Sequence, residues 1–424
     1  MIDRQGDTMK SIVFIGTQKA GSSRDAIKAA ERLGYYTILF TDKPVHLEKR
    51  LEYPDVHMMK LCDLNNTEEL VKNIEKLLFK GLRIEAIASF IDPFCHTACV
   101  LAERFGLRHF TPEAVRIMED KIESRNALEG TAYLPWYTSF SESDPPNKKE
   151  IKKKLPLIVK SPESAGSKDV YKAETQKQFD STVAKIIAKY PGVPVLAEEY
   201  IDGPQYIVEA AVLDGVIHIV AIIGQEITYN GKFIVTGYEL LHDLPDGLSD
   251  AVEDIVQLHG MKFGYCHLEM RLSAGGWKLI EINPRISGAG MNSLLQTGLG
   301  FNTVEQTLKS LLGFDASYEP VCKANAFAQY IIADRAGVLA RTTGKNKASK
   351  NEGVQSVYVK PRKGASLKPP ESMGDRLGYV IATGNTGLQA KENAKKAASL
   401  IRFHLADENE EQAFSGVAET VNDK

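Results

Sequence analysis

The segment 265–285 carries carboxylates at a spacing that could do metal-dependent chemistry. It reads as two apolar strands joined by a turn at 273–276, and Glu269 lies on the polar face of the first strand. Folding the hairpin about this turn brings Glu281 to about one residue from the position opposite Glu269, and Asn283 shares the face of Glu281. Two such close carboxylates repel unless a cation lies between them. Because an all-oxygen set suits magnesium, the segment predicts a metal–nucleotide site.

Arg285 extends this cluster with a permanent fork of donors. A guanidinium suits a phosphoryl group or the oxyanion of a tetrahedral intermediate. The alternative is a surface hairpin with scattered charges. We favour the site, because Glu281 and Asn283 interrupt a strand that is otherwise apolar.

Two further segments carry residues that suit a nucleotide. Lys160 ends the apolar strand 155–160, and the Ser/Gly-containing loop after it can place backbone N–H groups around phosphates. A plain hairpin loop is the alternative for this segment. The strands 195–201 and 206–213 carry acids that could bind an adenine amino group and ribose hydroxyls.

The chain has 424 residues, which predicts two to four structural units. Its formal net charge of −3 removes the strongest reason to expect a nucleic-acid partner. No apolar run approaches the ~20 residues that cross a bilayer, and the first residues lack the apolar core of a signal peptide. The five cysteines include no CxxC pair, which favours reduced thiols. We therefore expect a soluble, cytoplasmic protein with no membrane partner.

The N-terminal part alternates short apolar runs with helical patterns. Strands at 11–15, 35–40 and 84–90 with intervening helices predict a βαβαβ unit and a parallel sheet. The turn at 16–23 has the glycine spacing of a P-loop, but Ser22 stands where the phosphate-binding lysine is required. The turn also lacks GxGxxG, so we favour a tight strand-to-helix turn over a dinucleotide site.

The pattern changes at Thr111, which predicts the N-cap of a helix over 112–128. Hairpins with helices follow and indicate an α+β unit. After about residue 320 we expect a third unit that closes with a helix over 387–405. The predicted divisions are a flexible extension 1–8, a Rossmann-like domain 9–111, a core 112–320, a C-terminal domain 321–405 and an acidic tail 406–424.

Five motifs occur in an order that resembles the ATP-grasp superfamily of carboxylate–amine ligases. They are Asp120-Lys121, Lys160 with its loop, the segment 198–203, Glu269, and the segment 281–285. The resemblance covers residues from ~9 to ~405. It is closest to bacterial L-amino-acid ligases that make dipeptides, including the bacilysin-synthetase group and especially the methionine–glycine-forming type. It implies an ATP-grasp fold with an N-terminal Rossmann-like parallel-sheet domain and a C-terminal α+β domain, thus α/β and α+β together.

The resemblance also implies which residues contact ATP. Lys121 and Lys160 would contact its phosphates, and backbone atoms of 199–201 would read the adenine edge. Gln205 stands where many relatives carry a ribose-binding Glu, and Glu209 could share that contact. The implied ATP-binding residues are Lys121, Lys160, Ser164, Gly166, Ser167, Lys168, Glu198, Glu199, Tyr200, Ile201, Gln205 and Glu209.

By the same resemblance, Glu269, Glu281 and Asn283 would hold two magnesium ions, with manganese as an alternative. Arg285 would be the catalytic residue that neutralises the reacting oxygens. A substrate carboxylate attacks the γ-phosphate, ADP leaves, and the acylphosphate is captured by a second amino acid's amine. Positioning and charge neutralisation do most of the catalysis in phosphoryl transfer, so no enzyme nucleophile is needed. The chain has no GxSxG motif.

The amino-acid pocket is predicted from both geometry and resemblance. Asp92-Pro93 follows the third strand at its carboxyl end, where open α/β sheets bind ligands. Asp92 could take an ammonium group, and Pro93 could line a side-chain pocket. Gly288 and Ala289 leave room for a long apolar side chain, and Tyr238 could belong to a lid.

These features predict a ligase that joins an apolar first residue, Met or Leu, to a small second residue, Gly, Ala or Ser. Its partners would be small-molecule amino acids, and a homodimer is left open. The alternatives are an ATP-grasp ligase with another carboxylate or amine, and a non-catalytic ATP-binding regulatory module. A nicotinamide-dependent enzyme is disfavoured by the missing GxGxxG motif.

Overall fold

The structure is a computed structural model that describes residues 8–164, 166–229 and 231–406. The predicted acidic tail, apart from residue 406, and all but the last residue of the extension lie outside the described residues. Contacts divide the chain into two compact units. Unit 1 comprises Met1–Leu134, Tyr206–Ile222 and His242–Val321, and unit 2 comprises Pro135–Gln205, Ile223–Leu241 and Cys322–Lys424. The predicted linear domain boundaries stay predictions.

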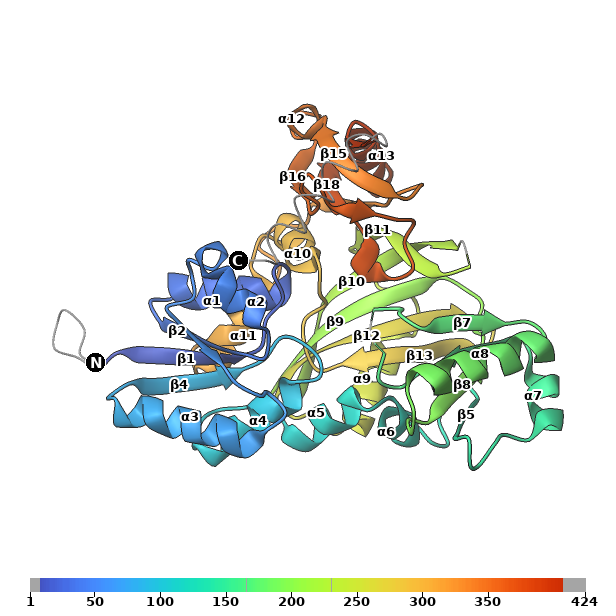
Figure 1. Ribbon diagram of the computed structural model, residues 1–424, viewed down its shortest axis with the longest axis horizontal. Coiled ribbons are helices and arrows are strands. Elements are labelled where there is room, and N and C mark those ends of the chain that lie inside the picture. The colour runs from blue at the N-terminus through green and yellow to red at the C-terminus, as the bar shows by residue number, and fades with distance from the viewer. Residues whose placement is uncertain (1–7, 165, 230, 407–424) are drawn as a thin grey trace, which may run out of the picture. The chain divides into compact units, whose positions relative to one another are not determined.

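Unit 1 begins with the expected parallel sheet, whose strand order is β3-β2-β1-β4. The helix α1 (Ser22–Arg32) lies on one face, and α3 (Thr67–Phe79) and α4 (Cys95–Arg104) lie on the other (Figure 1). Sequence reasoning missed β3, because its half-exposed residues form no apolar run. The strands are β1 (Lys10–Ile15), β2 (Tyr36–Thr41), β3 (Met58–Leu61) and β4 (Arg83–Ala88). Beside them lie the short helices α2 (Pro44–Glu48) and η1 (Arg50–Glu52).

The turn between β1 and α1 is the tight strand-to-helix turn that the sequence predicts. Gly21 is its last residue, with φ of +92°, a region that L side chains rarely adopt. A Cβ atom on Gly21 would also lie 2.9 Å from the carbonyl oxygen of Ala289. Glycine is therefore required here by both the backbone conformation and the close approach of a second segment.

The helix predicted over 112–128 is two helices, α5 (Pro112–Glu119) and α6 (Lys121–Asn126). Asp120 separates them: its backbone is extended, and its Oδ1 accepts hydrogen bonds from the N–H groups of Ile122 and Glu123. An aspartate that caps a new helix in this way ends the preceding one. The single-helix prediction was wrong because this capping signal was not used.

Cys95 and Cys99 are free thiols buried in α4. Thr111 does stand at the N-cap of α5, but its side chain makes no capping hydrogen bond. It accepts instead from the backbone N–H groups of Lys262 and Phe263. Thr111 thus connects α5 to the strand that follows Phe263.

The second sheet of unit 1 has the strand order β13-β12-β9-β10, and β10 continues into unit 2. Its strands are β9 (Gln205–Leu213), β10 (Val216–Tyr229), β12 (Gly264–Ser273) and β13 (Gly276–Asn283). The helices of this part are α9 (Leu248–Leu258), α10 (Met291–Leu299) and α11 (Thr303–Leu311). α10 and α11 both contact α1, which follows the first strand of the parallel sheet.

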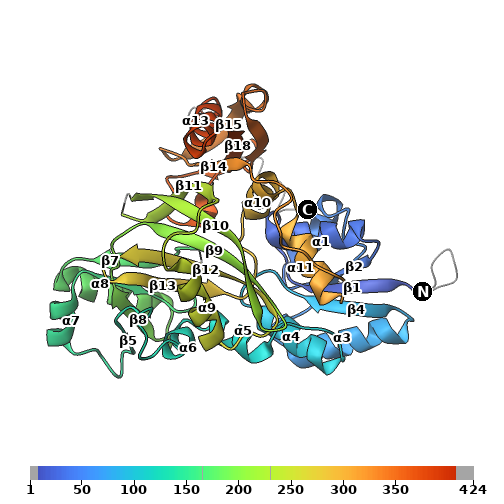
Figure 2. The same ribbon diagram turned by 180° about the vertical axis from the view of Figure 1, so that it is seen from behind.

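Unit 2 contains a four-stranded antiparallel sheet of order β5-β8-β6-β7, with α8 (Gln176–Lys189) packed on it (Figure 2). α8 begins with a capping box made by Thr175 and Gln178. The polar stretch before β6 contains α7 (Lys148–Lys154), because Ile151 is buried in this core. The strands are β5 (Tyr137–Phe140), β6 (Leu157–Lys160), β7 (Val170–Ala173) and β8 (Val195–Glu199).

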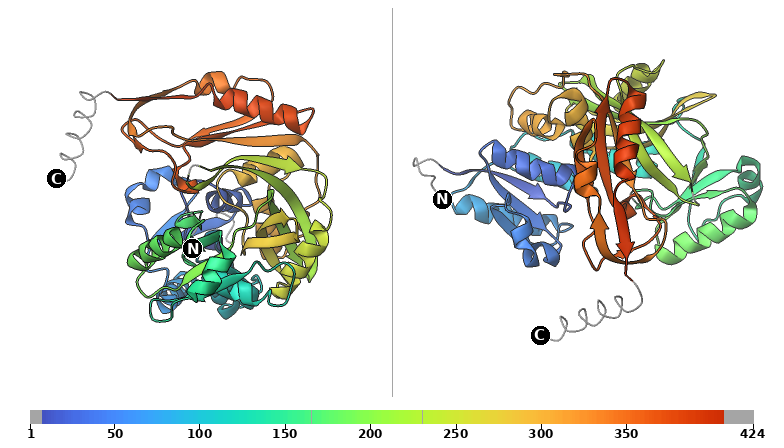
Figure 3. Two further views of the ribbon diagram at one scale, coloured as in Figure 1. Left: turned by 90° about the vertical axis from the view of Figure 1, so that its right-hand side faces the viewer. Right: turned by 90° about the horizontal axis from the view of Figure 1, so that it is seen from above.

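The remainder of unit 2 is a sheet of order β10-β11-β14-β18-β16 on which α13 (Gly387–Ala398) lies (Figure 3). The helix predicted over 387–405 ends at Ala398, since the residues of β19 pair with β15 instead. The strands are β11 (Phe233–Leu241), β14 (Asn325–Ile331), β15 (Gly337–Thr343), β16 (Val354–Val359), β17 (Ser366–Leu367), β18 (Gly378–Gly384) and β19 (Arg402–Leu405), and the short helices are α12 (Lys345–Ala348) and η2 (Met373–Asp375). Within the described ranges, no helix is long and apolar enough to cross a membrane.

A buried ion pair fixes α1 to the loop before β3. Arg24 and Asp55 are 4 % and 5 % exposed, and their side chains pair directly. The Arg24 guanidinium also lies 4.6 Å from the centre of the Tyr53 ring. Removing one member leaves the other charge buried without its partner, which is strongly unfavourable.

We expect Asp55→Asn to destabilise unit 1 by about 3 kcal/mol, because Arg24 loses its countercharge. Thermal unfolding followed by circular dichroism measures the effect as a lower midpoint. The double variant Arg24→Met/Asp55→Leu is the control, since it removes both charges and should recover most of the loss. A midpoint unchanged in Asp55→Asn would contradict this role of the pair.

Candidate active site

The hairpin of β12 and β13 brings the predicted metal-binding side chains together. Glu269 pairs directly with Glu281, and Asn283 pairs with His267. Side chains two residues apart on a strand share a face, so all four lie on the same side of the hairpin. The register predicted from alternation is confirmed, and a bulge after Glu269 follows the pair.

Lys121 supplies a positive charge to this face. It is the first residue of α6, and its Nζ lies 3.1 Å from Oε1 of Glu281. The side chains of Lys121 and Glu281 are 15 % and 27 % exposed, so the pair remains accessible to a ligand. The ammonium of Lys121 therefore offsets part of the repulsion between the carboxylates of Glu269 and Glu281.

These residues fit a magnesium ion. Glu269, Glu281 and Asn283 offer oxygen atoms on one partly exposed face, and magnesium prefers oxygen ligands together with water or phosphate oxygens. The Lys121 ammonium shows that the face attracts positive charge. The assignment of these residues as metal ligands stays a prediction.

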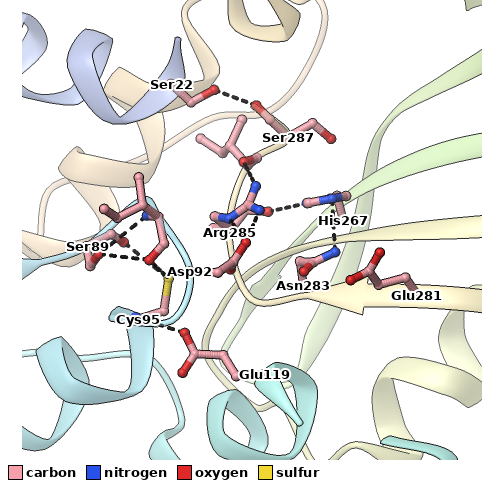
Figure 4. A network of polar contacts seen from close by, with 12 residues as sticks. Ser22, Ser89, Asp92, Cys95, Glu119, His267, Glu281, Asn283, Arg285 and Ser287 are labelled. Carbon is pink, nitrogen blue, oxygen red and sulfur yellow. Dashed lines mark hydrogen bonds and ion pairs between the residues drawn. The ribbon is translucent and has the colours of Figure 1, made fainter. Parts of the chain in front are cut away.

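Arg285 lies just beyond β13 and pairs with Asp92 (Figure 4). Its Nε donates to Oδ2 of Asp92 at 2.9 Å, and its Nη1 donates to the carbonyl of Ile286 at 3.1 Å. Burial opposes the charged form, but Arg285 outweighs this and lowers the pKa of Asp92. Asp92, predicted to take a substrate ammonium, therefore already holds the predicted catalytic arginine.

Glu119, which sequence reasoning missed, lies close to Asp92, with carboxylate oxygens of the two residues within 4.8 Å of each other. Its two oxygens accept from the N–H groups of Cys95 and His96, at 2.9 and 3.2 Å, at the start of α4. Burial and the charge of Asp92 raise the pKa of Glu119 to about 7. Burial also raises the pKa of the Cys95 thiol, which is thus no thiolate nucleophile. The signal in the sequence was weak, because Glu119 resembles any charged residue at a helix end.

The segment after Arg285 is held by buried polar groups. Ser22 Oγ donates to the carbonyl of Ser287, and the Ser287 N–H donates to Oε1 of Glu209 at 3.1 Å. Glu209 is 0 % exposed, and burial raises its pKa to about 7. This position argues against the predicted ribose contact of Glu209. Its carboxyl group supports the loop of Ser287 instead.

His267 contacts the same segment from the strand β12. Its Nδ1 lies 2.8 Å from the carbonyl oxygen of Arg285, and its Nε2 lies 3.3 Å from Nδ2 of Asn283. Burial, followed by the charge of Arg285, lowers the pKa of His267 to about 4. The imidazole is therefore neutral at physiological pH. Figure 4 shows it between Arg285 and Asn283.

In unit 2, Lys160 ends β6 and pairs with Glu198 of the neighbouring strand β8. Both side chains are less than a tenth exposed. Glu199 has the opposite orientation and is exposed, with Oε2 accepting from the N–H of Trp136 at 3.1 Å. The strand therefore presents one carboxylate to Lys160 and the next to solvent.

The loop after Lys160 has the compact backbone expected of a phosphate-binding segment. Gly166, Ser167 and Asp169 all have positive φ angles. Burial raises the pKa of Asp169, but hydrogen bonds from Lys189 and Tyr190 outweigh burial and lower this pKa overall. Near the start of the loop, Ser164 Oγ donates to the carbonyl of Ser161, and Lys168 is exposed.

The remaining predicted residues are more scattered. Tyr238 lies in β11, paired with β14, and it is buried with its hydroxyl accepting from Arg376 at 3.2 Å. The assignment of Tyr238 to a lid stays a prediction. Pro93, Gly288 and Ala289 are exposed in unit 1, while Tyr200 and Gln205 are partly exposed and Ile201 is buried in unit 2.

A backbone contact from η2 supports the loop after Lys160. The N–H of Met373 donates to the carbonyl of Gly166 at 3.1 Å. Met373 is the first residue of η2, where proline is accepted, and the extended Ser372 before it suits a following proline. Met373→Pro therefore removes this donor with little other disturbance of the backbone.

We expect Met373→Pro to make trypsin cleave after Lys168 roughly fivefold faster, as loss of a hydrogen bond worth ~1 kcal/mol implies. The rate of appearance of this fragment from the full chain is the measurement. Met373→Leu is the matched control: it keeps the N–H and loses the sulfur that accepts from the N–H of Val235. Equal cleavage rates in the two variants would contradict a role for the backbone contact.

Comparisons with known proteins match two parts of the chain to family models. Residues 153–293 match an ATP-grasp domain, and residues 329–406 match the L-amino acid ligase C-terminal domain 2. Formate-dependent phosphoribosylglycinamide formyltransferase of Sulfurisphaera tokodaii is 24 % identical, over 92 % of this chain and 96 % of its own. Dapdiamide A synthase of Enterobacter agglomerans is 23 % identical, over 71 % of this chain and 73 % of its own.

Among solved structures, the L-amino acid ligase from Bacillus licheniformis has a TM-score of 0.79 at 18 % identity. The match covers 95 % of this chain and all of that one. At this level of identity the likeness establishes the fold, which confirms the ATP-grasp prediction. Taken together, these matches show that the chain has the ATP-grasp fold, with an ATP-grasp domain over residues 153–293 and the L-amino acid ligase C-terminal domain 2 over residues 329–406.

Proposed function

We propose that this protein is an ATP-dependent L-amino-acid ligase that forms a dipeptide through an aminoacyl-phosphate. The observation that carries the proposal is the hairpin face with Glu269, Glu281 and Asn283, next to Arg285. Opposed oxygen ligands beside a fixed guanidinium suit a metal-bound triphosphate whose terminal phosphoryl is transferred. We choose amino acids as the substrate class because residues 329–406 match the C-terminal domain 2 of L-amino acid ligases.

Phosphoryl transfer needs charge neutralisation more than covalent chemistry. Glu269, Glu281 and Asn283 would hold magnesium, which when bound offsets the negative charge of the phosphates. In unit 1, Lys121 would leave Glu281 and bind phosphate oxygens in its place. The phosphate contact predicted for Lys160 in unit 2 is kept as a separate part of the proposal. A carboxylate oxygen of the first amino acid attacks the γ-phosphorus, and the bond to the β,γ-bridging oxygen breaks as ADP leaves.

The second step joins the two amino acids. The amine of the second attacks the acyl carbon, phosphate leaves, and the nitrogen loses a proton. The Arg285 guanidinium is placed to stabilise the oxyanion that forms at the acyl carbon. Asp92 keeps that guanidinium charged and oriented.

The carboxylates beside Arg285 suit the ammonium group of an amino acid. Asp92 Oδ1 is buried and, among the described residues, makes no hydrogen bond, and Glu119 lies within 4.8 Å of Asp92. Two carboxyl groups so close repel each other when both are ionised, and an ammonium would relieve this. We therefore extend the prediction for Asp92 to include Glu119. Pro93, Gly288 and Ala289 remain our choice for an apolar side-chain pocket, with Met or Leu first and Gly, Ala or Ser second.

We expect turnover of ATP to depend on magnesium and on paired amino acids, and to release ADP and phosphate. The measurement is incubation with a panel of amino-acid pairs, with separate assays of nucleotide, phosphate and dipeptide. AMP with pyrophosphate would exclude the acylphosphate route. No amino-acid-dependent turnover across the panel would favour the regulatory-module alternative.

A ligase or transferase acting on another carboxylate is a second candidate. The formyltransferase relative matches the chain along almost its whole length, and its name specifies formate and a phosphoribosylglycinamide. Replacing the first amino acid by formate in the same assay separates the two. ATP turnover with formate and a ribosyl amine, and none with amino acids, would select this candidate.

Glu281→Gln should reduce turnover at least a hundredfold, because an amide is a weak magnesium ligand and no longer offsets the charge of Lys121. The fold should persist, as Glu281 is partly exposed. Steady-state kinetics and circular dichroism are the measurements. Glu319→Gln, at an exposed glutamate, is the control and should leave turnover unchanged. Near-normal activity in Glu281→Gln would refute its metal role.

A further inference from the structure

The buried imidazole of His267 has no part in the chemistry proposed above, yet both its nitrogens contact the candidate site. It lies directly opposite Asn283 in the hairpin register and is 5 % exposed. One nitrogen faces the carbonyl oxygen of Arg285, and the other faces the side-chain amide of Asn283. Figure 4 shows both contacts.

The first contact determines where the imidazole carries its hydrogen. A carbonyl oxygen can only accept, so Nδ1 of His267, 2.8 Å from the oxygen of Arg285, must be the donor. The other ring nitrogen, Nε2, faces the amide nitrogen of Asn283, so it must be the acceptor of that contact.

The second contact then determines how the Asn283 amide is turned. The atom of Asn283 that faces Nε2, at 3.3 Å, is Nδ2, which can only donate. If the amide were reversed, its oxygen would face the lone pair of Nε2 and two acceptors would oppose each other. The oxygen Oδ1 is therefore left for another partner.

We propose that His267 is a positioning residue that turns Asn283 so that Oδ1, and not the NH2 group, is offered to the metal. This inference rests on the proposed function, since it assumes that the hairpin face binds magnesium. An amide has one oxygen that can bind a cation, and a free amide would present its NH2 group part of the time. Groups that orient a metal ligand in this way typically change metal affinity by 10- to 100-fold.

Two substitutions separate the two contacts of His267. In His267→Asn, the amide nitrogen can take the place of Nδ1 and keep the donor to Arg285, but nothing replaces Nε2. In His267→Gln, the longer side chain can place its oxygen near Nε2 and keep the acceptor for Asn283. The probe is Mn2+, titrated into the full-length chain in the presence of ADP and followed by electron paramagnetic resonance.

We expect His267→Asn to weaken Mn2+ binding about tenfold and His267→Gln to weaken it less than threefold. In an Asn283→Ala background, His267→Asn should produce no further loss, because its effect acts through Asn283. The same fold-change in both backgrounds would overturn the inference, as would parent-like affinity in His267→Asn. A merely structural role would lower the unfolding temperature without this dependence on Asn283.

Glu281→Gln distinguishes failure of this inference from failure of the proposed function. Loss of Mn2+ affinity in Glu281→Gln together with no effect of His267→Asn would reject only the role of His267. Unchanged Mn2+ affinity in Glu281→Gln would reject the metal site itself, and the inference with it. If His267→Asn does not fold, the comparison of His267→Gln/Asn283→Ala with Asn283→Ala still tests the coupling, and an effect larger than threefold there would contradict it.

Discussion

The constraint on which the candidate site depends is the repulsion between Glu269 and Glu281. They stand opposite each other on neighbouring strands, where like charges are destabilising. The chain compensates from outside the hairpin, because Asp120 starts a new helix and so places Lys121 beside Glu281. The break between α5 and α6 is therefore a requirement of the site as well as a feature of the fold. The ammonium of Lys121 thus offsets part of this repulsion.

Around this pair the charges alternate in sign. Arg285 lies two residues beyond the end of β13, and Asp92, which follows the parallel sheet, pairs with it. The buried imidazole of His267 contacts both the backbone of Arg285 and the side chain of Asn283. Glu281 and Asp92 each pair with a group of opposite sign, which lowers the cost of their partial burial.

The parts of the fold and site that could be predicted are those with a local or periodic signal. The register of the hairpin followed from alternation with period two, which places Glu269 opposite Glu281 once the turn is known. The parallel sheet followed from short apolar runs at regular spacing. β3 was missed because its residues are half exposed, and no alternation marks them.

The contacts that were missed join residues far apart in the sequence. Nothing near Asp92 signals that its partner is Arg285, because the pairing depends on how a parallel sheet meets an antiparallel one within unit 1. The same holds for Glu209, where a polar residue in an apolar strand was interpreted as a ligand contact. Its true partner is the N–H of Ser287.

Each of the two lysines predicted to bind phosphate forms an ion pair with a glutamate of its own unit. Lys160 pairs with Glu198, and Lys121 pairs with Glu281, so each ammonium already has an anionic partner. A phosphate that binds would exchange one anionic partner for another, and the lysine would not need to be desolvated anew. The difference between the pairs is their exposure. Because Lys160 and Glu198 are less than a tenth exposed and Lys121 and Glu281 more, the pair in unit 1 can part at lower cost. If Glu281 holds a metal ion as proposed, its release by Lys121 would make Oε1 available to that ion, so the binding of phosphate and the binding of metal would be linked.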